Sequence, residues 1–221
     1  MKRLMIFDLD GTVGNTLGSL ASTCNLVLED LGFAPLPEEN FKYYAGDGSR
    51  EMLKRCLRDA GDRNADLIEE AQVLYNKYFK TGCTKNISIY PGLLETLKQL
   101  KQCELMLAIC TNKAQPYAES VIHALYGDGF FDYILGEQPH IKRKPSPEGV
   151  FKILKALAVT PEECVYVGDT RTDMETGLAA GILTVGVTWG FRSRQELEES
   201  HGDIIIDHPC QLLELTLDST D

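Results

Sequence analysis

The part of the chain after residue 88 alternates short apolar runs with segments whose apolar residues recur every three or four positions. Short continuous apolar runs are typical of buried strands, and the longer spacing is typical of helices with one buried face. With an N-terminal apolar run at residues 4–7, this alternation predicts an α/β fold, in which helices cover both faces of a parallel sheet. The predicted strands are 4–7, 105–110, 131–135, 164–167, 183–187 and 203–206. The predicted helices are 91–101, 115–125, 147–157 and 172–180.

Residues 16–86 depart from this alternation. They contain helical patterns at about 17–31, 49–60 and 65–79 and no convincing strand, and Pro35 and Pro37 mark a loop between the first two. An all-helical block thus separates the first strand from the rest of the sheet. We therefore expect a core domain of residues 1–14 and 88–221, with a helical cap domain of residues 15–87 inserted into it.

Two carboxylates, Asp8 and Asp10, directly follow the N-terminal strand. Residues at positions i and i+2 of an extended chain point the same way, so both carboxylates can reach one site. Their mutual repulsion favours a bound cation or a shared proton. Taken alone, the stretch fits a solvated Asp-Gly turn equally well.

Other polar residues follow the remaining predicted strands. In an open parallel sheet, ligands bind beyond the carboxyl ends of the strands, so these residues should meet at one edge. Each has a plain explanation by itself, such as a helix cap for Thr111 or a solvated cation for Lys144. Taken together, these plain explanations become improbable, which indicates a functional site. The residues are Asp8, Asp10, Thr111, Asn112, Lys144, Asp169 and Asp173.

Charge and composition limit the partners. The formal net charge of -11 disfavours nucleic-acid binding, because a phosphate backbone would be repelled. No apolar stretch reaches the roughly 20 residues of a membrane-spanning helix, so no membrane partner is expected. The seven cysteines are scattered without a C-x-x-C pair, which indicates reduced thiols and a cytoplasmic protein.

Four of these features, in this order, resemble the motifs of the haloacid dehalogenase (HAD) superfamily of phosphohydrolases. Asp8-Leu9-Asp10-Gly11-Thr12 resembles the first motif, Thr111-Asn112 the second, Lys144-Pro145 the third, and the stretch from Gly168 to Asp173 the fourth. The resemblance covers essentially the whole chain and is strongest to the phosphoglycolate phosphatase-like branch. It implies a Rossmann-like parallel-sheet core, with the helical insertion as its cap. Gly14 departs from the pattern, since relatives more often have an apolar residue there, and could loosen the hinge of the cap.

The resemblance also implies a chemistry. Asp8 would be the nucleophile and form an aspartyl-phosphate. Asp10 would protonate the leaving group and then activate water. The resemblance places Mg²⁺ on Asp8, the backbone carbonyl of Asp10 and Asp169. It assigns the transferring phosphoryl group to Thr111, the Asn112 amide and Lys144, and assigns Asp173 to orienting Lys144 or a metal-bound water.

The branch favours 2-phosphoglycolate as the substrate of a Mg²⁺-dependent phosphatase. The four motifs read only phosphate and metal, so Arg50, at the start of a cap helix, is the candidate cation for the substrate carboxylate. A sugar-phosphate mutase similar to β-phosphoglucomutase, a nucleotidase and a pyrophosphatase stay open as alternatives. A non-catalytic phospho-receiver module is disfavoured by the cap and by the arrangement of Asp8 and Asp10. The expected partner is a small phosphorylated metabolite, and the protein could be a monomer or a homodimer.

Overall fold

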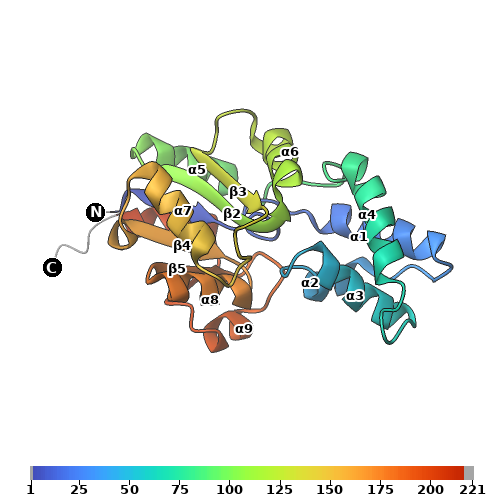
Figure 1. Cartoon of the computed structure of the whole chain (residues 1–221). Coiled ribbons are helices and arrows are strands. Elements are labelled where there is room, and N and C mark those ends of the chain that lie inside the picture. Colours follow the sequence, from blue (N-terminus) through green and yellow to red (C-terminus); the bar gives the residue numbers. More distant parts are fainter. Residues whose placement is uncertain (1, 217–221) are drawn as a thin grey trace.

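A computed structural model describes residues 2–216 of the chain. Its centre is a six-stranded, fully parallel sheet with the strand order β3-β2-β1-β4-β5-β6 (Figure 1). The predicted α/β class is thereby confirmed. The strands are β1 Leu4–Phe7, β2 Met106–Ala114, β3 Tyr133–Glu137, β4 Cys164–Gly168, β5 Leu183–Val187 and β6 Ile204–Ile206.

The strand β2 extends four residues beyond the predicted strand at 105–110. After a register shift it pairs again with β3, where Ala114 lies opposite Glu137. The extension is polar in sequence, Thr111 to Lys113, yet all three residues are buried. The apolar pattern alone therefore predicts an end of the strand that is four residues too early.

Helices cover both faces of the sheet. All four residues of β1 are fully buried, and they alternate between two hydrophobic clusters, Met5 and Phe7 in one and Leu4 and Ile6 in the other. This is the pattern of a central strand that is covered on both sides. The helices of the sheet-containing part are α5 Leu93–Gln102, α6 Gln115–Tyr126, α7 Glu148–Leu157, α8 Arg171–Ala180 and α9 Arg194–Glu199, with short 3-10 segments at Pro161–Glu163 and Pro209–Thr216. The apolar pattern did not predict α9, because Leu197 is its one buried residue.

Four helices form the block between β1 and α5: α1 Leu17–Asp30, α2 Phe41–Tyr44, α3 Ser49–Ala60 and α4 Ile68–Gly82, with a 3-10 turn at Glu38–Asn40. Figure 1 shows this block at one end of the sheet. The helix α4 begins three residues later than predicted, because the Asp62 carboxylate accepts hydrogen bonds from the amides of Asp66 and Leu67 and holds a turn there. No described helix has the length and apolar character needed to cross a membrane.

We propose that this block is the cap domain, residues 15–87, on a core of residues 1–14 and 88–221; residues 1 and 217–221 lie outside the described chain. The two connecting segments run side by side, because Asn15 and Ser88 exchange two backbone hydrogen bonds of 2.8 and 3.0 Å. Gly14 precedes this pair, and a Cβ atom there would lie 3.0 Å from Leu125. The space that a larger side chain would need is thus filled from α6.

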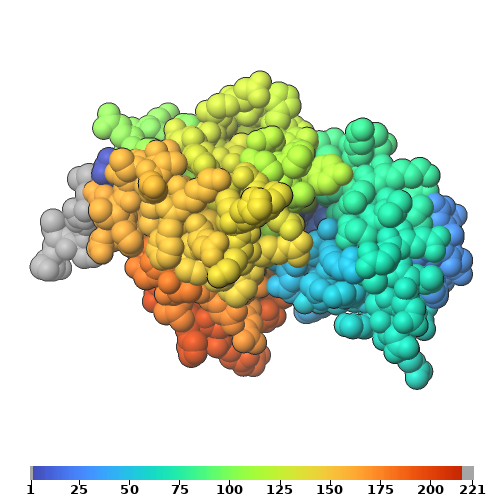
Figure 2. Space-filling model, in the orientation of Figure 1, coloured from blue at the N-terminus to red at the C-terminus, as the bar shows by residue number. Residues whose placement is uncertain are grey.

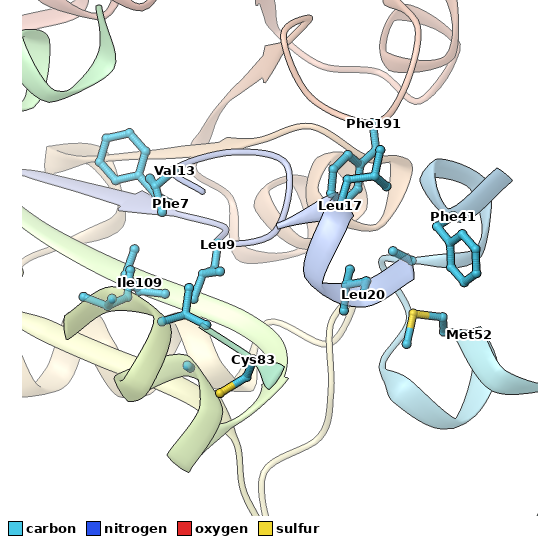
Figure 3. Close-up of a cluster of buried hydrophobic side chains, with 14 of the residues drawn as sticks. Phe7, Leu9, Val13, Leu17, Leu20, Phe41, Met52, Cys83, Ile109 and Phe191 are labelled. Atoms are coloured by element: carbon cyan, nitrogen blue, oxygen red, sulfur yellow. The ribbon is translucent and has the colours of Figure 1, made fainter. Parts of the chain in front are cut away.

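The cap and the core share one hydrophobic cluster. Figure 3 shows it running from Phe7 of β1 through Leu17 and Leu20 of α1 to Phe41 and Met52 of the cap. Continuous apolar contact of this kind stabilises the cap in its position on the core.

Polar contacts close the boundary on the side of α2 and α3. The Arg192 guanidinium donates to the carbonyls of Lys42 and Ala45, and Asn112 Nδ2 donates to the carbonyl of Gly46 at 3.1 Å. In the space-filling view the cyan cap atoms of this region abut the yellow atoms around residue 143 (Figure 2), and Gly48 lies against Arg143. The structure therefore holds the cap closed against the sheet edge.

Candidate active site

Four of the predicted residues beyond the carboxyl ends of the strands line one cavity, and Lys144, Asp169 and Asp173 adjoin Asp8 outside this lining. The cavity has a volume of about 80 Å³ and lies between the sheet edge and the cap. Asp8, Asp10, Thr111 and Asn112 line it from the core. Asp8 and Asp10 both face it, as their positions after β1 predicted.

Asp8 is buried, with 5% of its surface exposed, and lies 2.9 Å from Lys144 Nζ through its Oδ1 atom. The two atoms form an ion pair, and Oδ1 accepts no hydrogen bond from any other described residue. Burial raises the pKa of Asp8 to about 6, although the Lys144 ammonium opposes the shift. A buried carboxylate oxygen without a hydrogen bond is costly, so this atom is suited to contact a substrate or a cation.

Lys144 is held by a second carboxylate. Its Nζ donates to Asp173 Oδ1 at 2.6 Å, and the other oxygen of Asp173 accepts from the amide and hydroxyl of Thr170 at 3.0 and 2.6 Å. These bonds form a capping box at the start of α8, which fixes Asp173. Burial opposes the charge of Lys144, but Asp173 and Asp8 outweigh it and hold the pKa of the ammonium well above its usual value. Asp173 is thus placed to orient Lys144.

The Asn112 side chain has a role that sequence reasoning missed. Its Oδ1 accepts from the Lys144 amide at 2.9 Å, and its Nδ2 donates to the Lys144 carbonyl at 3.2 Å. The same Nδ2 reaches the carbonyl of Gly46 in the cap. Asn112 therefore positions both the loop of Lys144 and a cap loop. The predicted phosphate contact through its backbone amide stays a prediction.

Asp169 is fully buried at the end of β4. Thr12 donates its hydroxyl to Oδ1 and the Phe191 amide donates to Oδ2, both at 2.8 Å. A Cβ atom at Gly11 or at Gly190 would clash with this carboxylate, so both glycines are required for the close approach. Burial and the charges of Asp173 and Asp8 raise the pKa of Asp169 well above its usual value.

The oxygens of three carboxylates, from Asp8, Asp169 and Asp173, lie within 4.8 Å of one another. Asp173 accepts three hydrogen bonds from Lys144 and Thr170, whereas Asp169 accepts one at each oxygen, so Asp8 and Asp169 are the carboxylates better able to bind a cation. The Oδ1 atom of Asp8, which accepts no hydrogen bond from another described residue, and the all-oxygen donor set fit a hard divalent cation such as Mg²⁺. The carboxylate of Asp10 is not part of this group and accepts from Lys113 and Thr16 instead. Asp10 would therefore contribute only the predicted backbone carbonyl to a metal site.

Lys113 is a site residue that sequence reasoning missed. Its Nζ lies 2.7 and 2.9 Å from the two carboxylate oxygens of Asp10, and Oδ1 of Asp10 also accepts from the Thr16 hydroxyl at 2.6 Å. The Nζ atom is 5.0 Å from the centre of the Phe79 ring in the cap. A signal was available, because Lys113 follows Thr111 by two residues and would share its face of an extended chain. The apolar run predicts a strand that ends at residue 110, however, and so leaves Lys113 outside it.

Arg50 is the predicted site residue that the structure does not bring to the others. It lies in the first turn of α3, forms a salt bridge with Glu69 of α4 and is not among the residues that line the cavity. Its side chain is 38% exposed. In this position of the cap it does not reach the phosphate-binding residues.

Known proteins have sequences and structures similar to this chain over nearly its whole length. A family model described as haloacid dehalogenase-like hydrolase matches residues 5–187. A phosphoglycolate phosphatase of Haemophilus influenzae is 31% identical over 218 residues, which cover 96% of this chain and 97% of that protein. One of Aquifex aeolicus is 30% identical over 213 residues, with 96% of each chain covered.

Structural similarity extends over the same length. The crystal structure of a predicted phosphoglycolate phosphatase from Haemophilus somnus matches with a TM-score of 0.90 at 27% identity, and 98% of each chain is covered. The family match spans most of the chain and includes Asp8, Asp10, Thr111, Asn112, Lys144, Asp169 and Asp173. The chain therefore belongs to the haloacid dehalogenase-like hydrolase family.

Proposed function

We propose that this enzyme is a Mg²⁺-dependent phosphatase that hydrolyses a small phosphate monoester, 2-phosphoglycolate, through an aspartyl-phosphate on Asp8. The observation that carries the proposal is the Asp8 carboxylate, whose buried Oδ1 has no hydrogen-bond partner among the described residues and faces Lys144. An oxygen that no hydrogen bond occupies can act as a nucleophile, and the Lys144 ammonium beside it can offset the charge of a phosphoryl group.

The first half of the reaction transfers the phosphoryl group to the enzyme. A carboxylate oxygen of Asp8 forms a bond to phosphorus while the bond from phosphorus to the ester oxygen breaks. The departing alkoxide takes a proton from Asp10, which borders the same cavity. Lys144, Thr111 and the Asn112 amide hold the phosphoryl oxygens, where negative charge is spread in the transition state.

The second half releases phosphate. Asp10, now a carboxylate, takes a proton from a water molecule as its oxygen attacks phosphorus. The bond from phosphorus to Asp8 breaks, which restores the Asp8 carboxylate. The hydrogen bonds that Asp10 accepts from Lys113 and Thr16 fix its orientation for both proton transfers. Mg²⁺ held by Asp8, the Asp10 carbonyl and Asp169 would lower the repulsion between the carboxylate and the phosphate.

Two observations support a small substrate. The relatives described above are named phosphoglycolate phosphatases. The cavity, at about 80 Å³, has room for about six water molecules, which is in the size range of a small ester. The seven cysteines are all free and five are buried, which supports a cytoplasmic location, where thiols stay reduced.

The test combines turnover with detection of the intermediate. The wild-type protein with Mg²⁺ is expected to release phosphate from 2-phosphoglycolate with a higher kcat/KM than from nucleoside monophosphates or pyrophosphate. Substrate labelled with ³²P should leave acid-precipitable label on wild-type protein after rapid quenching, and none on Asp8→Asn. Retained turnover in Asp8→Asn would refute the mechanism, and a preference for nucleotides or pyrophosphate would refute the substrate.

A further inference from the structure

Lys113 is the one lysine or arginine among the described residues that line the cavity. Its side chain is 4% exposed and lies at the boundary between the core and the cap. Lys144 contacts Asp8 and Asp173 from outside this lining, and Arg50 pairs with Glu69 on the surface. The cavity thus offers a single cation to any charged group that extends beyond the phosphate.

The hydrogen bonds of Lys113 leave part of this cation free. An ammonium has three N–H donors, and two of them reach Asp10 Oδ1 and Oδ2. No described residue accepts the third, and the Phe79 ring, 5.0 Å away, is the neighbour on the cap side. Lys113 can therefore hold Asp10 and still donate to a ligand without breaking the existing pair.

The position of Lys113 matches the part of a substrate that lies beyond the ester bond. The proposed acid Asp10 must lie within hydrogen-bond distance of the ester oxygen. Lys113 Nζ is 2.7 Å from Asp10, so it lies within roughly 6 Å of that oxygen by ordinary hydrogen-bond lengths. In a phosphorylated 2-hydroxy acid the carboxylate is one carbon beyond the ester oxygen, within the reach of this ammonium.

We propose that Lys113 determines specificity by binding a second anionic group, the carboxylate of a phosphorylated 2-hydroxy acid. The inference rests on the proposed function, since it places the phosphate at Asp8 and Lys144. A carboxylate in this cavity would otherwise meet Asp8 and Asp10 alone, and their charges would repel it. Lys113 offsets this repulsion at the place where the second anion must lie.

The test uses binding of inert ligands, because the contact of Lys113 with Asp10 would alter turnover of every substrate. 3-Phosphonopropionate has the length of 2-phosphoglycolate with a carbon in place of the ester oxygen, and propylphosphonate lacks the carboxylate. Calorimetry with Mg²⁺ is expected to show that the wild type binds 3-phosphonopropionate at least tenfold tighter. Lys113→Met should lose this preference, and Lys113→Arg should keep most of it, since a cation remains.

Two further variants separate the competing explanations. Lys98→Met makes the same substitution on the exposed surface of α5 and should keep the full preference. Arg50→Ala tests the other candidate cation, and this variant should also keep the full preference for 3-phosphonopropionate. A wild type without preference, a Lys113→Met variant that retains it, or its loss in Arg50→Ala instead would overturn the proposal. Thermal unfolding of each variant shows whether a lost binding preference comes from misfolding. If Lys113→Met is misfolded, the preference of Lys113→Arg decides whether a cation at this position is required.

Failure of the proposed function gives a different result. If 3-phosphonopropionate is preferred in a manner that depends on Lys113, but 2-phosphoglycolate is not hydrolysed, the substrate assignment fails and the role of Lys113 stands. If 2-phosphoglycolate is hydrolysed and Lys113→Met still prefers 3-phosphonopropionate, the function stands and the role of Lys113 fails.

Discussion

Thr172 of α8 donates its hydroxyl to Oδ1 of Asp47 at 2.9 Å, and this bond ties the loop before α3 to the core helix that carries Asp173. The other oxygen of Asp47 pairs with Arg55. Burial opposes the charge of Asp47, but the hydrogen bonds from Arg55 and Thr172 outweigh it and lower its pKa. The carboxylate is therefore ionised throughout the neutral range, and the contact between cap and core persists there.

Replacing Thr172 with Val removes this hydroxyl while it keeps the shape of the side chain. A hydrogen bond to a charged group contributes about 1.5–3 kcal/mol, less where the pair is half-exposed as here. We expect kcat/KM for the substrate to fall by about three- to tenfold, because the closed position of the cap loses a bond. Steady-state kinetics measures the effect.

Thr188→Val is the matched control for this prediction. Thr188 also donates its hydroxyl to a carboxylate, Asp207 Oδ1 at 2.7 Å, but both residues lie on the core. Its substitution should change stability by a similar amount and leave kcat/KM unchanged. Equal kinetic effects of the two substitutions would mean that the contact of Thr172 with Asp47 has no special role in cap closure.

Asp173→Asn should weaken the site through Lys144. The substitution removes the charge that lies 2.6 Å from Lys144 Nζ but keeps an oxygen that can cap α8. Breaking a buried ion pair costs about 3–5 kcal/mol, so we expect a lower melting temperature and a loss of at least about a hundredfold in kcat/KM.

Thr170→Ala separates the two roles of Asp173. It disrupts the capping box of α8 without changing a charge, and loss of a cap costs about 0.5–2 kcal/mol. Its stability should fall, while its kcat/KM should fall much less than that of Asp173→Asn. If both variants lose activity to the same extent, Asp173 acts by holding the helix and not by orienting Lys144.

The sequence predicted the sheet, the long helices and the group of core residues, because buried strands and motif residues leave local patterns. Lys113 was missed because the apolar run that predicts the strand ends at residue 110, and the bonding partners of Lys113 and of the Asn112 side chain lie far away in the sequence. Their contacts with Asp10, Lys144 and Gly46 join segments that are 32 to 103 residues apart. Arg50 had the right charge at a plausible place, but its nearest partner, Glu69, comes from the next helix of the cap. Spacing along a chain does not encode such pairings.

Asp10→Asn should slow proton transfer and leave substrate binding in place. A well-placed general acid or base contributes about 10²–10⁴-fold in rate, so we expect a fall of that size for 2-phosphoglycolate, whose alkoxide leaves poorly without a proton. In single-turnover phosphorylation of the enzyme, p-nitrophenyl phosphate should lose much less, because its leaving group needs no proton. The same loss for both substrates in that step would refute the acid role of Asp10.

Magnesium should stabilise the folded protein through Asp169. The buried carboxylates of Asp8 and Asp169 repel each other in the absence of a cation, and a cation that binds only the folded state raises its stability. A Mg²⁺ concentration one hundred times the dissociation constant would add about 2.7 kcal/mol. Differential scanning calorimetry should therefore show a melting temperature that rises with Mg²⁺ and returns on addition of EDTA.

Asp169→Asn is the critical variant for the metal site, because its amide oxygen can still accept from the Phe191 amide and its Nδ2 can donate to the Thr12 hydroxyl. Loss of one buried charge should make the metal-free variant at least as stable as the wild type, since repulsion with Asp8 and Asp173 is relieved. Its melting temperature should no longer respond to Mg²⁺. A response equal to that of the wild type would place the magnesium-binding residues elsewhere in the protein, whatever the activity of the variant.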